Sequence, residues 1–191
     1  MKRKFSNKYK QMIDNTKRII YKIEPGLKKY NTIMDKIHSV DVSKDAEFQR
    51  NFNGFYRMRQ RSKTFYSTYY SLMEKCKSTP MEFKDILETL YHELNRVEPS
   101  FSSKLLATIN TSMPIWDVFV LKNLNLKKPP QYSKTRLEDT VKLYDKIVNW
   151  YHHKTKSSEG IEMIKIFDEA YPDSNISNIK KIDFILWQTR K

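Results

Sequence analysis

Two ionisable side chains near the middle of the sequence, Lys104 and Asp117, stand where they could do chemistry. The apolar spacing predicts that Lys104 opens one short helix and that Asp117 lies in the first turn of the next, beside Trp116. The helix dipole favours a carboxylate at a helix start and disfavours a cation there, so the position of Lys104 needs another explanation. Proteins use amines and carboxylates for nucleophilic and electrostatic catalysis, which makes this pair the first candidate for an active site.

Other patterns that could carry chemistry have simpler explanations. Adjacent histidines on a helix point about 100° apart, and no H-E-x-x-H is present, so we expect no metal site from His38, His92 and the pair at 152–153. Glu82 and Lys84 have the spacing of a nuclease carboxylate–lysine pair, but helix capping explains Glu82 better. Cys76, at helical spacing, is typical of a core residue.

The small numbers of glycine and cysteine exclude several classes of cofactor site. With 3 Gly in 191 residues, the chain has neither a Walker loop nor a dinucleotide fingerprint. Its single Cys excludes an intramolecular disulfide, a multi-Cys zinc site and an iron–sulfur cluster. We therefore expect no cofactor.

The charge of the chain indicates a polyanionic partner. Lys and Arg number 36 against 22 Asp and Glu, a formal net charge of +14, and nucleic acid is the first candidate for such a surplus. The richness in Lys, Asn, Ile and Tyr is also what an AT-rich genome produces. That alternative does not explain why four of the nine Arg fall between positions 50 and 61.

Two segments concentrate cations without any acid, residues 50–63 and residues 122–136. Arg binds a phosphate through two N–H groups and stacks on bases better than Lys does. The first segment, which is rich in Arg, is therefore the best candidate for a contact surface. The predicted nucleic-acid contacts are Arg50, Arg57, Arg59, Arg61, Lys63, Lys122, Lys127 and Lys128. DNA is favoured over RNA as the partner.

The apolar spacing predicts an all-α protein, a compact orthogonal helical bundle. Apolar residues recur at three and four along most of the chain, and no alternating strand pattern is longer than a few residues. Thr79-Pro80-Met81-Glu82 and Thr135-Arg136-Leu137-Glu138 read as capping boxes that start helices. Ser43, Ser100 or Ser102, and Pro114 mark further starts, Asn53-Gly54 suggests a kink, and 154–160 reads as a polar loop.

The length favours one domain, residues 1–191, and two packed sub-lobes at 1–98 and 99–191 are the alternative within it. The basic, proline-containing segment 127–134 is the clearest connector. No apolar stretch follows the basic start and none approaches a membrane span, so a cytoplasmic protein without membrane contact is expected.

Residues 102–124 resemble the core of the helix-hairpin-helix DNA glycosylase superfamily, its 8-oxoguanine glycosylase branch in particular. The resemblance rests on Ser103-Lys104-Leu105-Leu106 and on Pro114-Ile115-Trp116-Asp117, which leads into an apolar helix. It implies that Lys104 is the catalytic lysine and Asp117 the catalytic aspartate. The chain departs from the superfamily at its hairpin, since residues 98–103 contain no Gly, and in its shorter interval between Lys and Asp.

The resemblance implies base excision from DNA in DNA repair, by glycosylase activity with or without abasic-site lyase activity. A target base would be unstacked into a pocket, Lys104 would attack the anomeric carbon to form a Schiff base, and Asp117 would take the proton or stabilise the positive charge. Phe55, Tyr56 and Trp116 would stack on the base or fill the gap it leaves; as an alternative, they are ordinary core aromatics.

Two other functions remain open from the sequence. One is a non-catalytic DNA-binding module in defence or regulation with a degenerate glycosylase-like fold, and the other is a helical protein-interaction protein. The whole chain also resembles a group of small α-helical bacterial proteins that share phrases like Phe48-Gln49-x-x-Phe52-Asn53-Gly54-Phe55-Tyr56. That second resemblance implies no activity.

Overall fold

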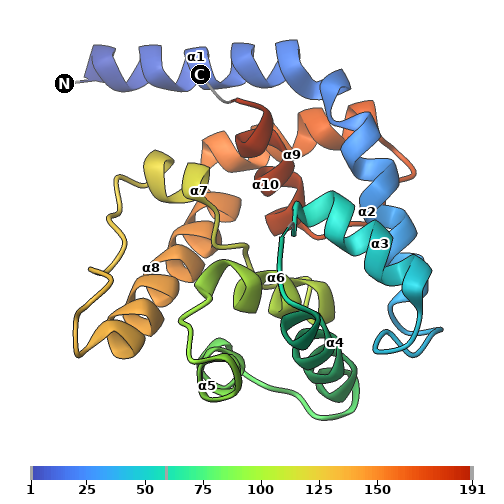
Figure 1. Ribbon diagram of the computed structural model, residues 1–191. Helices are drawn as coiled ribbons and strands as arrows, with labels where there is room; N and C mark the ends of the chain where they lie inside the picture. The colour runs from blue at the N-terminus through green and yellow to red at the C-terminus, as the bar shows by residue number, and fades with distance from the viewer. Residues whose placement is uncertain (1, 59, 190–191) are drawn as a thin grey trace.

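The fold is all-α, as the sequence predicts. A computed structural model describes residues 2–58 and 60–189, and the side chains of residues 2–6 and 8 lie outside the described set. Within these ranges there are ten α-helices and no strand (Figure 1). The helices are α1 (Lys2–Ile19), α2 (Glu24–Lys36), α3 (Ala46–Tyr56), α4 (Lys63–Ser78), α5 (Phe83–Leu94), α6 (Pro99–Ile109), α7 (Val118–Asn123), α8 (Arg136–Lys156), α9 (Ser158–Ala170) and α10 (Asn178–Gln188).

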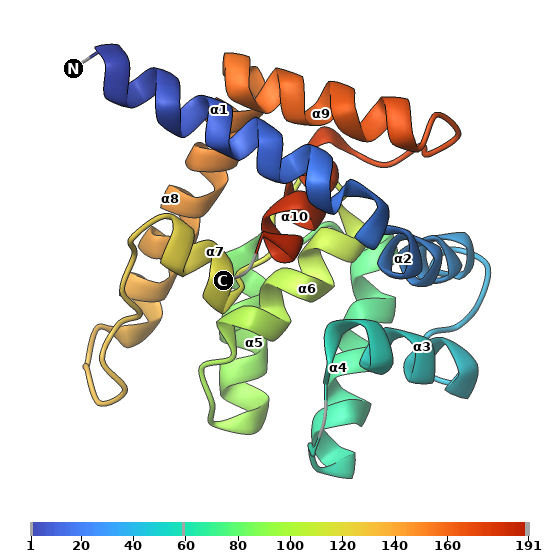
Figure 2. The same ribbon diagram turned by 90° about the horizontal axis from the view of Figure 1, so that it is seen from above.

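Helix α10 lies at the centre of the bundle. Every residue from Ile179 to Leu186 is buried, including two lysines and an aspartate. The other helices surround α10: it packs against α7, α8 and α9, while α1 lies across α9 on one side (Figures 1 and 2). A helix buried on all sides is expected to be apolar all round, so its three charged residues stand out.

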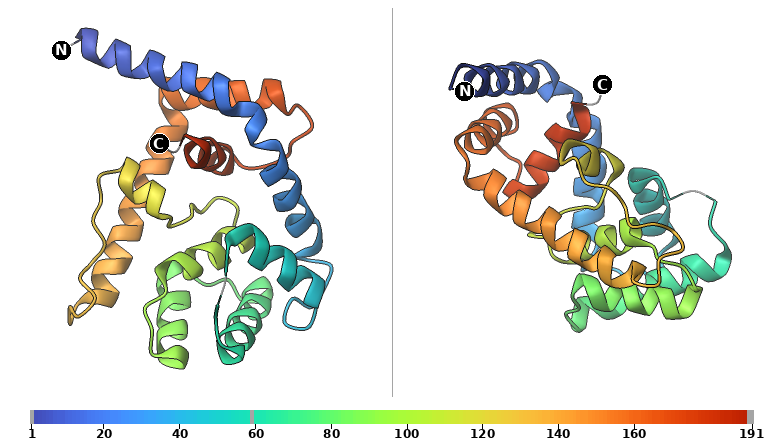
Figure 3. Two further views of the ribbon diagram at one scale, coloured as in Figure 1. Left: turned by 45° about the horizontal axis from the view of Figure 1, so that its top comes forward. Right: turned by 90° about the vertical axis from the view of Figure 1, so that its left-hand side faces the viewer.

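Helices α4 and α5 pack around α6 in the lower part of the bundle, and α2 and α3 pack against each other at its side (Figure 1). Helix α4 packs against α5 and α6, and α5 packs against α6 and α8 (Figure 3). Helices α5 and α6 are joined by a four-residue turn whose first residue, Asn95, has φ of 50°. Asn tolerates this left-handed conformation, and it ends α5 where Gly is more usual.

Several helices begin or end at residues other than those expected from the sequence. Helix α5 begins at Phe83, three residues after Pro80, because Glu82 and Asp85 make the reciprocal capping box. Asp45 rather than Ser43 caps α3, and its side chain accepts from Phe48 N at 2.6 Å. Helix α3 passes through Asn53-Gly54 without ending.

Three other expected boundaries also differ, and one start, that of α8, agrees. Helix α6 starts at Pro99, ahead of both serines proposed as caps. Helix α7 starts after Asp117 and not at Pro114. Helix α8 does begin after Thr135, without a capping bond from the Thr135 hydroxyl to the helix backbone. Only Ser157 separates α8 from α9, so the expected loop at 154–160 is helical on both sides.

None of the helices in the described ranges combines the length and the apolar character needed to cross a membrane.

Candidate functional site

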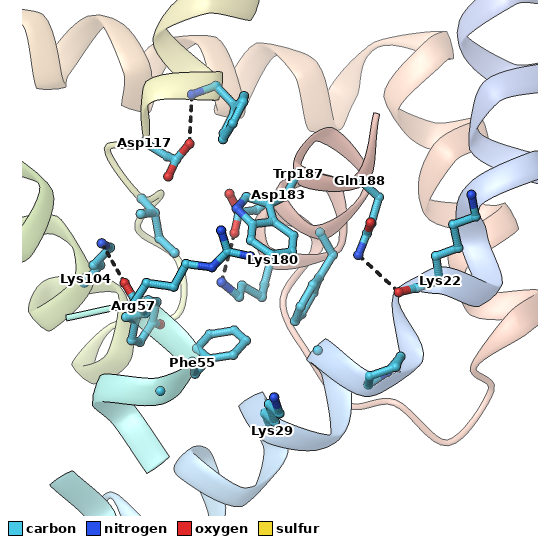
Figure 4. A pocket seen from close by; sticks show the side chains of 17 residues that line it. Lys22, Lys29, Phe55, Arg57, Lys104, Asp117, Lys180, Asp183, Trp187 and Gln188 are labelled. Atoms are coloured by element: carbon cyan, nitrogen blue, oxygen red, sulfur yellow. Dashed lines mark hydrogen bonds and ion pairs between the residues drawn. The ribbon is translucent and has the colours of Figure 1, made fainter. Parts of the chain in front are cut away.

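A cavity of about 420 Å³ opens between helices α2, α3, α6 and α10, and we call it the central cavity (Figure 4). Aromatic and charged side chains line it together. The charged residues that line it are Lys22, Lys29, Arg57, Lys104, Lys180, Asp117 and Asp183. Lys104 and Asp117, the two residues that the resemblance singles out, therefore reach one cavity from different segments.

Lys104 does not open a helix as expected: α6 starts at Pro99, so Lys104 lies in the middle of α6, away from the helix start, and it projects toward the end of α3. Its Nζ donates to the backbone oxygen of Tyr56 at 3.2 Å, and it lies 5.0 Å from the centre of the Phe101 ring. Burial lowers the pKa of the Lys104 ammonium from 10.5 to about 8; the Asp117 charge opposes this effect and the Lys180 charge adds to it. A lysine with such a pKa has a substantial amine fraction near neutral pH, which is what a nucleophile requires.

Asp117 caps helix α7 and faces the same cavity. Its Oδ1 accepts from Phe119 N at 2.8 Å, which fixes the carboxylate at the helix start. The neighbouring backbone is tied to α6, because Trp116 N donates to Ser103 Oγ at 2.8 Å. This buried bond joins the residue before Asp117 to the residue before Lys104, so one contact sets the position of both side chains.

The wall formed by α10 carries a second lysine–aspartate pair. Lys180 Nζ lies 2.9 Å from Asp183 Oδ2, and the two side chains are 7% and 11% exposed. The other carboxylate oxygen, Asp183 Oδ1, accepts from the Tyr151 hydroxyl at 3.3 Å. Both charges are thus buried, paired and next to the cavity.

Aromatic rings form the rest of the wall. Phe55 and Tyr56 contact each other edge to face with their centroids 4.7 Å apart, and both line the cavity. Tyr56 is buried, and its hydroxyl lies 3.3 Å from Thr108 Oγ1. Trp187 lies near the end of α10, where the Arg57 guanidinium sits over its ring.

The structure does not support the prediction that Trp116 stacks on a base. Trp116 is 1% exposed and lies in the hydrophobic core instead of lining the cavity. Its Nε1 is buried without a hydrogen-bond partner in the described part of the chain. Trp116 is thus a core aromatic, which was the alternative given for it.

The predicted nucleic-acid contacts do not all gather at the central cavity. Arg57 lines it, whereas Arg61 is half-buried over the Phe101 ring and ion-paired with Glu98 at 3.6 Å. Arg50 and Lys63 line a separate polar hollow between α3 and α4. The three predicted contacts on and after α7 are exposed but do not line the cavity: Lys122, Lys127 and Lys128. Arg59 lies outside the described residues.

Lys180, Asp183 and Trp187 were not found from the sequence, although one pattern could have indicated them. The segment Asn178-Ile-Lys-Lys-Ile-Asp-Phe-Ile-Leu-Trp puts charged residues in an otherwise apolar helix. Charges inside an apolar helix are seldom structural, because burying them without a partner is unfavourable. Lys22 and Lys29 were also missed, since they belong to a long basic stretch with no feature that marks them.

Among the residues described, no group of three or more His, Cys, Asp or Glu side chains is placed to hold a metal ion.

No protein-family model matches the sequence, and no curated protein and no solved structure is similar enough to it to count as a match.

Proposed function

We propose that this chain is a DNA-binding base-excision enzyme, a glycosylase with abasic-site lyase activity, in which Lys104 is the nucleophile and Asp117 its electrostatic partner. The observation that carries the proposal is that both side chains line one cavity of about 420 Å³, in which the Lys104 amine is half-buried. Lowering of the Lys104 pKa to about 8 supports the same role.

The reaction follows from these groups. The neutral Lys104 amine attacks the anomeric carbon of the nucleotide, the glycosidic bond breaks, and its electron pair leaves with the base. Asp117 stabilises the positive charge that develops on the sugar. Loss of a proton from the attached nitrogen and opening of the sugar ring then give a Schiff base between Lys104 and the sugar.

The size and walls of the central cavity fit a single base taken out of the DNA stack. An enzyme cannot reach the glycosidic bond inside a duplex, so the nucleotide must be rotated into a pocket. Aromatic rings at the wall, Phe55 and Trp187, offer stacking faces for a planar base. The exposed cations at the rim, Lys22, Lys29 and Arg57, suit the phosphates on either side of it.

The α5–α6 pair adds support from the backbone. It consists of a helix, a short turn and a helix that packs back on the first, and Lys104 follows the turn by six residues. That order matches the superfamily that residues 102–124 resemble. The turn begins with Asn95 in a left-handed conformation, which is how a hairpin without Gly is built here.

Borohydride trapping on an abasic-site duplex tests the proposal, because it reduces a Schiff base to a stable covalent adduct. We expect wild type to form the adduct and Lys104→Gln to lose it while still binding the duplex. Lys154→Gln is the matched control, since Lys154 is 12% exposed, contacts the Trp150 ring and lies away from the cavity.

Each other outcome points to a different function. Salt-dependent DNA binding without any adduct would overturn catalysis and favour the non-catalytic DNA-binding module. Trapping on RNA alone would overturn DNA as the substrate. If neither an adduct nor nucleic-acid binding is found, a helical protein-interaction protein with an acidic partner becomes the better explanation of the +14 charge.

A further inference from the structure

Lys180 is enclosed by aromatic rings at the wall of the central cavity. Its Nζ lies within 6 Å of four ring centres: Tyr30 at 4.9 Å, Phe184 at 5.0 Å, Phe55 at 5.4 Å and Tyr56 at 5.7 Å. The residue as a whole is 6% exposed, yet it lines the cavity. The rings and Asp183 together hold a positive charge in a place with little water.

A structural role does not require this charge at this wall. The neighbouring Lys181 shows how the same helix uses a buried lysine elsewhere: it pairs with Asp168 at 2.6 Å, the Asp168 side chain is 47% exposed, and neither residue lines the cavity. A buried ion pair is weak support for stability, because desolvation offsets the attraction between the charges. A buried cation at the wall of a cavity acts strongly on any charge that develops beside it.

Building on the proposed function, we propose that Lys180 stabilises the negative charge on the departing base, and that the substrates are bases that leave as anions with charge delocalised onto a ring carbonyl oxygen. Lys180 forms one described ion pair, with Asp183, so its ammonium has further N–H groups to donate. Asp117 acts on the opposite charge, the one that develops on the sugar.

The electrons and protons balance without any further reactant. The bond from C1′ to the base nitrogen breaks, its electron pair moves into the base ring, and the carbonyl oxygen bears the negative charge opposite Lys180. The bond from Lys104 Nζ to C1′ forms at the same carbon. The proton that the attached Lys104 nitrogen then loses passes to the base, which leaves as a neutral molecule, while Lys180 keeps its protons throughout.

This role predicts which bases the enzyme removes. Hypoxanthine, uracil and 8-oxoguanine carry a ring carbonyl that takes up the charge. Adenine differs from hypoxanthine in having an amino group in place of the carbonyl, so it gains less from a nearby ammonium. A base alkylated to a cation, such as 7-methylguanine, leaves without negative charge, and Lys180 would repel it on entry.

The experiment measures single-turnover excision of these five bases from otherwise identical duplexes, with borohydride trapping on a preformed abasic site in parallel. Trapping needs no departing base, so it reports Lys104 chemistry alone. The variants are Lys180→Gln, which can still donate to Asp183 but has no charge, and Lys181→Gln as the matched control.

We expect wild type to excise hypoxanthine but not adenine, and at least one carbonyl base in preference to 7-methylguanine. Lys180→Gln should lower that excision by about 100-fold, the usual effect of losing one preorganised group that stabilises an anion. Trapping at the abasic site should change little, and Lys181→Gln should preserve both activities.

Three results would overturn the inference. One is a wild-type preference for adenine or 7-methylguanine. This result comes from wild type alone, so it does not depend on whether Lys180→Gln folds. Another is an equal loss of excision and trapping in a folded Lys180→Gln, which would make Lys180 a support for Lys104. The third is trapping at abasic sites with no excision of any carbonyl base. The lyase part of the proposed function would then be kept, and the role of Lys180 in base release would be overturned. Absence of all trapping would instead overturn the proposed function itself.

Discussion

The guanidinium of Arg57 lies over the indole of Trp187, with its Cζ 5.0 Å from the ring centre. Arg57 ends α3 in a left-handed conformation, with φ of 55°, and Trp187 is in the last turn of α10. The contact joins two segments that are far apart in the sequence, at the edge of the cavity that both residues line. It places a planar cation over one face of an aromatic ring at the edge of the cavity.

We expect Arg57→Gln to weaken duplex binding more steeply at low salt than at high salt. If Arg57 contacts a phosphate, its loss should reduce the slope of log affinity against log salt by about one unit. Fluorescence anisotropy with a labelled duplex over a range of salt concentrations measures this slope. Arg18→Gln is the control, because Arg18 is exposed on α1 and its side chain donates to Asn15 instead of lining the cavity. An unchanged slope in Arg57→Gln, or equal losses in both variants, would contradict the phosphate contact.

The lowered pKa of Lys104 predicts how trapping depends on pH. Only the neutral amine attacks, so the trapping rate should rise about tenfold for each pH unit below pH 8 and level off above it. A lysine with the ordinary pKa of 10.5 would still gain rate well above pH 9. Initial rates measured between pH 6 and pH 10 separate the two cases, and a rate that keeps rising to pH 10 would exclude the lowered pKa.

Replacing Lys104 by Met should stabilise the protein while it removes trapping. The folded-state pKa is below the unfolded value, so folding disfavours the charged form and the unfolded chain binds more protons between about pH 8 and 10.5. Wild-type stability should therefore rise through this window, and Lys104→Met should be more stable at pH 7 by about 1 kcal/mol, as is common when a functional charge is removed.

Urea denaturation at pH 7 and pH 10 measures this difference. The variant's advantage should shrink as the pH rises, because above about pH 8 the Lys104 amine of the folded wild type loses its charge and no ammonium is buried any longer. A variant that is less stable than wild type at pH 7 would show that the bond from Lys104 to Tyr56 O outweighs the burial of the charge.

The parts of the fold that depend on local sequence were predictable. Apolar residues at three- and four-residue spacing indicated most helices. The capping residue of α5 was not predictable. The segment Thr79-Pro80-Met81-Glu82 has the pattern of a helix start, and it competes with the pair Glu82 and Asp85 three residues later. A helix begins at the stronger of two competing capping arrangements, and the sequence does not show which of them is stronger.

Of the two lysine–aspartate pairs at the candidate site, only one was predictable from the sequence. Lys104 and Asp117 lie 13 positions apart in a segment that resembles a known superfamily, whereas Lys180 and Asp183 belong to a helix whose burial depends on the whole bundle. The apolar residues around these charges are a local sign of burial, but which of the charges face a cavity depends on how α10 packs in the bundle. The same tertiary packing decides that Trp116 is in the core while its neighbour Asp117 faces the cavity.

Two glycines offer a matched test of the described packing. A Cβ at Gly160 would collide with the backbone oxygen of Lys154, where the end of α8 meets the start of α9. Gly160→Ala should therefore destabilise the protein by about 2 kcal/mol or more, since backbone and not a flexible side chain must move.

A Cβ at Gly54, inside α3, meets nothing within 4 Å, so Gly54→Ala should stabilise the fold by about 0.5–1 kcal/mol through helix propensity. Thermal and urea unfolding of both variants measure these changes. Equal effects on the two variants would mean that the one-residue junction between α8 and α9 is looser than its described contacts, since a Cβ at Gly160 would then meet no fixed backbone.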